Sequence, residues 1–341
     1  MDYQTGLSTS EKIKLHYMTI FAQCFSPCGK YLVAANNYGK IAVFNIGNIL
    51  NPDSIQVQDK ELKLPRFSFQ GHDGPIYALT STKQFLISAG VGDIIGWAWS
   101  DILNKQAKVA WTLSVPQRDL LGKPETNAIV LGENEFSTNL FSAGGDNNVY
   151  EWDLESGSQK TTFQGHTDYI HCLATSNQNE CISGSEDGSV RIWDLRKPQN
   201  EAILLEPYKK DKCVRPKFGK WIGCVALDSR SDWLACGGGP ALTLWHMGSF
   251  EPTTVYESVD ATLACCAFYD DLVIAGGGDS NFYQMNINGN LKSKIPTSAP
   301  SIYSISTNIL YQNELASVAG TSYKIDVCPS FKYRDFVLYF T

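Results

Sequence analysis

One short pattern recurs along this chain and constrains its fold more than any other feature. Each copy has a short apolar strand, a turn rich in Gly, Asp or Asn, and a second strand that ends near an aromatic or apolar side chain. The seven copies are residues 32–46, 86–99, 140–154, 181–195, 234–246, 273–287 and 315–327. Because the copies lie about 40 to 55 residues apart, they indicate a repeat architecture rather than two unrelated domains.

The residue types in each copy favour strands joined by tight turns. In residues 190–193 (VRIW) and 242–245 (LTLW), β-branched, aromatic and other strand-forming residues make up short runs, which is typical of strands. The turns between paired strands, such as residues 186–188 (EDG), contain residue types that tolerate a positive φ. Since one small antiparallel sheet cannot bury both of its faces, we expect an all-β chain whose seven sheets pack face to face in a closed ring.

The ring is predicted to span residues 17–341, which leaves residues 1–16 as an N-terminal arm. A short helix on the ring, or an extra strand that closes it, would also fit residues 1–16. Residues 336–340 (FVLYF) can supply the fourth strand of the last sheet. A closing strand from the N-terminus is therefore not required.

Composition excludes several classes of protein. With 28 Lys and Arg against 35 Asp and Glu, the net charge is −7, so the chain as a whole does not attract nucleic acid. No run of 18 apolar residues could span a membrane, and residues 1–14 lack the apolar block of a signal peptide. The ten cysteines and the absence of an Asn-x-Ser/Thr sequon fit a reducing intracellular compartment.

Two dipeptide marks resemble those of WD-repeat β-propellers: Gly71-His72 and Gly165-His166, with Trp152-Asp153 and Trp193-Asp194. The resemblance implies a single seven-bladed WD-repeat β-propeller. It also implies a buried hydrogen-bonded set in the fourth copy and a partial set in the second. The full set is His166, Ser183, Asp187 and Trp193, and the partial set is His72, Ser88 and Asp93.

A His near a Ser and an Asp could instead form a hydrolase triad. We favour structural bracing, because the members recur at fixed places within a repeat. The sequence has no Gly-x-Ser-x-Gly elbow and no Gly-x4-Gly-Lys-Ser/Thr phosphate loop, and Cys24 and Cys28 are too far apart for a zinc knuckle. We therefore expect no catalysis, no cofactor, no metal and no small-molecule substrate.

One basic run interrupts the acidic chain: Lys209, Lys210, Lys212, Arg215, Lys217 and Lys220. It enters the fifth blade and is expected to lie beside the turn at residues 237–240, at the same end of the ring. The run could contact RNA or an acidic partner segment. We favour a solvated loop, because only Phe218 within it could stack on a base.

Three longer runs, residues 18–46, 166–174 and 221–246, resemble the WD-repeat subunits of the THO complex. This resemblance implies a non-catalytic scaffold in the nucleus, nuclear speckles included. Its partners would be other THO complex subunits and, indirectly, messenger ribonucleoprotein. Through the THO/TREX assembly it would couple transcription and processing of mRNA, splicing included, to mRNA export.

A rival interpretation comes from Trp193-Asp194-Leu195-Arg196. This tetrad resembles the Trp-Asp-x-Arg pattern of WD-repeat substrate receptors of cullin-based ubiquitin ligases. In such a receptor, Arg196 would contact the ligase adaptor.

Overall fold

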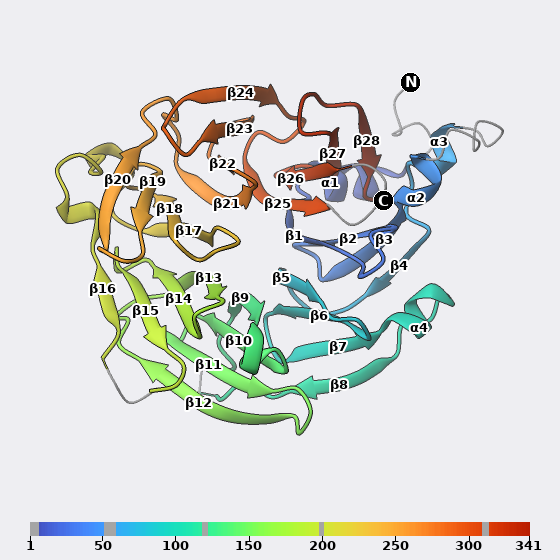
Figure 1. The fold of residues 1–341 in the computed structure, drawn as a ribbon. Coiled ribbons are helices and arrows are strands. Elements are labelled where there is room, and N and C mark those ends of the chain that lie inside the picture. Colours follow the sequence, from blue (N-terminus) through green and yellow to red (C-terminus); the bar gives the residue numbers. More distant parts are fainter. Residues whose placement is uncertain (1–6, 51–58, 118–121, 198–200, 309–313) are drawn as a thin grey trace.

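The computed structural model describes residues 7–50, 59–117, 122–197, 201–308 and 314–341. Seven four-stranded antiparallel sheets surround a central axis like the blades of a propeller (Figure 1). The inner strands of neighbouring blades contact one another all the way round, including β1 and β25 at the two ends of the chain. The sequence prediction of an all-β, seven-bladed β-propeller is confirmed.

Each blade uses four consecutive strands, numbered here from the axis outward. The first four blades are β1 (Ile20–Phe25), β2 (Tyr31–Asn36), β3 (Lys40–Asn45) and β4 (Phe67–Gln70); β5 (Ile76–Ser81), β6 (Phe85–Gly90), β7 (Ile94–Ala98) and β8 (Val109–Leu113); β9 (Thr126–Leu131), β10 (Asn139–Gly144), β11 (Asn148–Asp153) and β12 (Ser158–Gln164); and β13 (Ile170–Ser176), β14 (Glu180–Ser185), β15 (Val190–Asp194) and β16 (Ile203–Leu205). The last three are β17 (Ile222–Leu227), β18 (Trp233–Gly238), β19 (Thr243–His246) and β20 (Glu251–Val255); β21 (Leu263–Tyr269), β22 (Leu272–Gly277), β23 (Asn281–Asn286) and β24 (Leu291–Pro296); and β25 (Ile302–Asn308), β26 (Leu315–Gly320), β27 (Lys324–Pro329) and β28 (Phe336–Tyr339).

The repeated pattern corresponds to the second and third strands of each blade. Cys181 pairs with Trp193 in blade four, and Leu86 pairs with Trp97 in blade two. The expectation that the second copy ends its strand at Trp99 is corrected, because β7 ends at Ala98 and Trp99 begins α4 (Trp99–Leu103). Both indoles are buried. Since alternate residues of a strand share a face, periodicity alone could not distinguish Trp97 from Trp99.

The N-terminal segment packs on the seam between the first and last blades. Residues 9–16 form α1 (Thr9–His16), which begins with a capping box between Ser8 and Glu11. Leu15 is buried in an apolar cluster shared by blades one and seven. Of the three forms considered for this segment, the structure shows the short helix over these residues rather than a free arm. The boundary between arm and ring at residue 17 stays a prediction.

The remaining helical turns are short. They are α2 (Ile46–Ile49), α3 (Asp59–Leu62), and the 3-10 turns Asn134–Phe136, Pro207–Lys209 and Pro216–Phe218. Among the described residues, none of the helices has the length and apolar character needed to cross a bilayer.

Candidate functional sites

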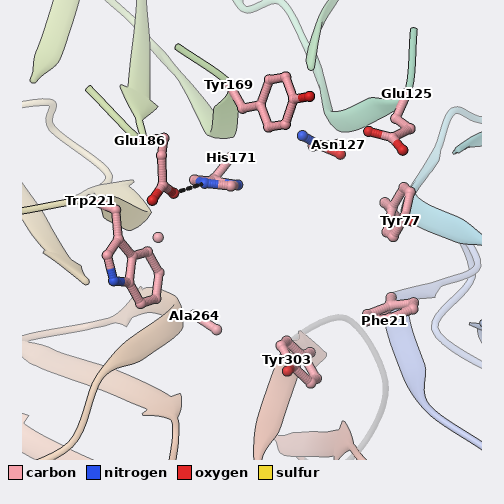
Figure 2. A pocket seen from close by; sticks show the side chains of 11 residues that line it. Phe21, Tyr77, Glu125, Asn127, Tyr169, His171, Glu186, Trp221, Ala264 and Tyr303 are labelled. Carbon is pink, nitrogen blue, oxygen red and sulfur yellow. Dashed lines mark hydrogen bonds and ion pairs between the residues drawn. The ribbon is translucent and has the colours of Figure 1, made fainter. Parts of the chain in front are cut away.

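The inner strand of every blade begins with a β-bulge. In blade one, Ile20 pairs with Asn36 and Ala22 pairs with Ala35, so Phe21 is left out of the pairing. The same shift occurs in all seven blades. The residues at this position are Phe21, Tyr77, Asn127, His171, Gly223, Ala264 and Tyr303. Because a bulge redirects the extra residue, the six side chains and Gly223 surround one end of the central channel (Figure 2).

These seven residues and four from adjacent loops line a cavity of about 470 Å³. The loop residues are Glu125, Tyr169, Glu186 and Trp221. Blades seven, one and two contribute three adjacent aromatic rings. The ring centre of Phe21 lies 5.2 Å from that of Tyr77 and 5.3 Å from that of Tyr303. One side of this channel mouth is therefore an aromatic wall (Figure 2).

Blade five contributes an indole from its entry loop instead of a bulge side chain. A β-carbon at Gly223 would collide with the ring of Trp221 and with the backbone of Leu263, so only glycine fits there. The indole is fixed because Trp221 Nε1 donates a 3.1 Å hydrogen bond to the Phe218 carbonyl. Its ring centre lies 6.1 Å from that of His171.

Two carboxylates lie at the channel mouth, Glu125 beside the aromatic wall and Glu186 across from it (Figure 2). Glu186, in the turn between β14 and β15, pairs with His171 Nε2 at 2.7 Å. Glu125, just before β9, lies close to Tyr77; burial and this carboxylate raise the pKa of the Tyr77 phenol. None of the eleven lining residues is Lys or Arg, so negative charge dominates the cavity.

The structure brings together all four members of the set expected in blade four. Trp193 Nε1 donates to Ser183 Oγ at 2.9 Å, and Ser183 Oγ lies 2.8 Å from His166 Nε2. On the other side of the ring, His166 Nδ1 lies 2.8 Å from Asp187 Oδ2. Because the carboxylate can only accept, Nδ1 is the protonated nitrogen, and the hydroxyl of Ser183 donates to Nε2. The hydrogen bonds thus run in one direction, from the Trp193 indole through Ser183 and His166 to the Asp187 carboxylate.

Asp187 is held as an anion by this arrangement. Burial alone would raise its pKa, but hydrogen bonds from His166 and Ser189 outweigh burial and hold the pKa well below its usual range. The His166 side chain has no solvent exposure. A substrate therefore has no access to this His-Ser-Asp cluster, which argues against use of the set as a hydrolase triad.

Blade two contains only part of this arrangement. His72 Nε2 lies 2.8 Å from Ser88 Oγ, which accepts a 2.9 Å hydrogen bond from Trp97 Nε1. Asp93, expected in the set, forms an ion pair with Lys123 instead. The turn from β6 to β7 has one residue fewer than the turn from β14 to β15, so Asp93 immediately precedes its strand. Trp97, which the sequence analysis left out of the set, is recognisable from its pairing with Leu86.

The basic run lies beside the turn at residues 237–240, as expected. Arg215 donates to the carbonyls of Gly238, Gly239, Pro240 and Val259 at 2.9 to 3.0 Å. Arg215 therefore links the entry loop to the fifth blade through hydrogen bonds. Burial lowers the pKa of this guanidinium.

Most of the lysines in the basic run have acidic or aromatic neighbours. Lys209 pairs with Glu206, Lys210 with Glu251 and Lys217 with Asp260, at 2.7 to 2.8 Å. The ammonium of Lys220 lies 5.7 Å from the ring centre of Tyr208. Within the described residues, Lys212 is the one member of the run that has neither an ion pair nor a contact with an aromatic ring. Much of the positive charge is thus neutralised locally.

Arg196 lies at the other end of the ring. It follows β15, whereas Glu186 at the channel mouth precedes that strand. Its guanidinium Nε lies 2.9 Å from Asp194 Oδ1, and its side chain is 56% exposed. A partner could reach this side chain without disturbing the channel mouth.

Comparison with known proteins identifies the proteins that this chain resembles. Residues 157–194, which include most of blade four, match the WD domain, G-beta repeat. The chain is 44% identical to THO complex subunit 6 of Homo sapiens over 331 residues, covering 96% of this chain and 94% of the human protein. It is 41% identical to the THO complex subunit 6 homolog of Danio rerio over 330 residues, covering 96% and 99% of the two chains.

A more distant match bears on the rival interpretation. DDB1- and CUL4-associated factor 5 of Homo sapiens is 30% identical over 145 residues, which is 40% of this chain and 14% of that protein. This match is limited to part of the ring, whereas the similarity to THO complex subunit 6 extends through all seven blades. The chain therefore belongs to the THO complex subunit 6 family of WD-repeat proteins.

Proposed function

We propose that this chain is a non-catalytic scaffold subunit of the THO assembly, a nuclear complex that couples transcription and processing of mRNA to mRNA export. The similarity to human THO complex subunit 6 carries the proposal, because it covers 96% of this chain and 94% of the relative. Similarity of that extent includes the loops and blade edges as well as the propeller core. Loops on a rigid scaffold are where binding residues concentrate.

The geometry supports a role in holding partners. Because consecutive strands of each blade are antiparallel, their connecting loops lie at both ends of the ring. The His166 side chain, in a cluster that resembles a catalytic set, is closed to solvent. The basic run is largely paired within the chain, which supports indirect contact with messenger ribonucleoprotein through other subunits. Such a protein would hold its partners in place and would not catalyse a reaction.

Purification tests the proposal. The tagged full-length chain, isolated from nuclear extract at physiological salt, should recover other THO subunits in stoichiometric amounts, measured by quantitative mass spectrometry. The same tag on an unrelated seven-bladed propeller is the control. Recovery of no THO subunits above this control would reject the proposal. A predominantly cytoplasmic signal for the tagged chain by microscopy would contradict the nuclear location.

Receptor activity in a cullin-based ligase is the second candidate function. The exposed Arg196 and the partial match to DDB1- and CUL4-associated factor 5 favour it. It is weaker because the match covers 40% of the chain, and because the Arg196 guanidinium already pairs with Asp194. An adaptor would have to compete with that ion pair.

A further inference from the structure

We infer that the channel mouth binds an arginine side chain presented by an extended segment of a partner protein. The lining residues carry this inference, and it does not depend on the proposed place in the THO assembly. The site is formed by the seven bulge positions, with Trp221 over Gly223 and the carboxylates of Glu125 and Glu186 beside them.

The aromatic wall offers ring faces and edges to a cation. Phe21, Tyr77 and Tyr303 come from three successive blades. The ring centre of Phe21 lies 5.2 Å from that of Tyr77 and 5.3 Å from that of Tyr303. Tyr303 is 40% exposed, so the wall can be reached from solvent. A guanidinium stacks favourably on the faces of such rings.

The carboxylates supply the complementary charge. Glu186 has one ion-pair partner, His171, and no hydrogen bond or ion pair engages the Glu125 carboxylate within the described residues. The lining contains two carboxylates and no Lys or Arg, so the carboxylates of Glu125 and Glu186 attract a cation that enters the cavity. A planar guanidinium can stack on the rings and bond to a carboxylate at once, which favours arginine over lysine. A phosphate group would be repelled, so RNA is not the expected occupant.

The size of the cavity limits what can enter. A volume of about 470 Å³ lies within the range typical of sites for small ligands. It accommodates one long side chain and a short stretch of backbone, and it is too small for a folded domain. The occupant is therefore a flexible segment rather than a globular surface.

Binding can be followed at His171, because the chain contains only five histidines. The probes are two synthetic peptides, acetyl-Gly-Gly-Arg-Gly-Gly-amide and the same peptide with citrulline, which has arginine's shape without its charge. Titration of the full-length protein is read by NMR of the imidazole signals, and a His171→Gln variant identifies the His171 signal. We expect the arginine peptide to shift that signal in a saturable manner, with the citrulline peptide at least about tenfold weaker.

Variants distinguish the effect of the two carboxylates in the site from the effect of the protein's net charge on peptide affinity. Glu125→Gln with Glu186→Gln should weaken the arginine peptide about tenfold or more, and Phe21→Ala should weaken it without any change of charge. The matched control, Glu155→Gln with Glu257→Gln, removes two exposed carboxylates elsewhere and should leave affinity unchanged. Equal affinity for the two peptides, equal weakening by both double variants, or a His171 shift caused by an oligouridylate but not by the arginine peptide would overturn the inference.

Discussion

The side-chain amide of Asn308 donates a 2.7 Å hydrogen bond to the carbonyl of Gly29, joining blade seven to blade one across 279 positions of sequence. A second bond across the same seam runs from Gln23 Nε2 to the Ser304 carbonyl at 3.2 Å. All four strands of blade seven come from the C-terminal part of the chain. Lateral packing and these bonds thus close the ring, and among the described strands none is exchanged between its two ends.

Replacing Asn308 should therefore weaken closure of the ring. Asn308→Ala leaves the buried Gly29 carbonyl without this donor, and we expect a loss of about 1 to 3 kcal/mol in the free energy of unfolding. Urea unfolding of the full-length chain measures it. The control is Asn290→Ala at an exposed turn, expected within about 0.5 kcal/mol of wild type. Equal stability of the two variants would show that the seam does not depend on this bond.

Trp193 should be a principal anchor of blade four. It is 4% exposed, packs against Phe163 with ring centres 5.7 Å apart, and donates to Ser183. Trp193→Ala should cost about 3 to 5 kcal/mol through the cavity it leaves. Thermal and urea unfolding check this value, with the exposed Tyr333→Ala as a control. A melting temperature unchanged from wild type would contradict a bracing role.

Asp187 should make the stability of blade four depend on pH in the acid range. Its pKa is well below the ordinary value in the folded chain, against about 3.9 when unfolded. The carboxylate therefore stabilises the native state above about pH 4, and this contribution is lost as the pH falls further, because the unfolded chain then binds the proton first. The stability difference between wild type and Asp187→Asn, from urea unfolding at pH 3 to 7, should shrink toward acid. A difference independent of pH would contradict this account.

The fold could be predicted from the sequence because each copy of the repeat contains the local signals of two strands and the turn between them. Residues 181–195 correspond to β14 and β15 with the turn between them, since alternation and turn residues are local signals. Trp99 and Asp93 mark the limit of such signals. Trp97 and Trp99 lie two positions apart, so periodicity alone cannot distinguish them, although only Trp97 lies in β7. The turn before β7 is one residue shorter than the turn in blade four, and there Asp93 pairs with Lys123.

The channel mouth could not be recognised from local patterns, because its residues share no chemistry. Phe21, Asn127 and Gly223 have in common only their position after the first residue of an inner strand. Aligning the seven copies on that residue, such as Ile20 or Ile222, would have revealed the set. The bulge that turns them toward the axis, and the placement of Trp221 over Gly223, depend on three-dimensional packing.

Isolated protein should bind single-stranded RNA weakly. The net charge is −7, and Lys209, Lys210 and Lys217 already have acidic partners. We expect a dissociation constant no tighter than about 10 µM at physiological salt, measured by fluorescence titration with labelled RNA. Tight binding would contradict this expectation if changing Lys209, Lys210, Lys212 and Lys217 to Gln abolished it. The matched control changes four exposed lysines elsewhere to Gln: Lys12, Lys30, Lys108 and Lys292.

Arg196 separates the two candidate functions. Its guanidinium is exposed and pairs with Asp194 at the end of the ring away from the channel mouth. In a THO scaffold, Arg196→Ala should leave recovery of THO subunits unchanged, because an exposed turn residue rarely moves stability by more than about 0.5 kcal/mol. In a ligase receptor, the same change should remove the cullin adaptor, because an interface arginine can be worth about 2 kcal/mol or more.

Affinity purification of wild type and Arg196→Ala, with partners quantified by mass spectrometry, distinguishes these outcomes. Lys197→Ala is the matched control, since Lys197 is the next residue, exposed and of the same charge. We expect all three samples to contain THO subunits in equal amounts. A cullin adaptor present with wild type and Lys197→Ala, lost with Arg196→Ala, and accompanied by no THO subunit in any sample would reverse the assignment, because only a receptor docks its adaptor through that one side chain.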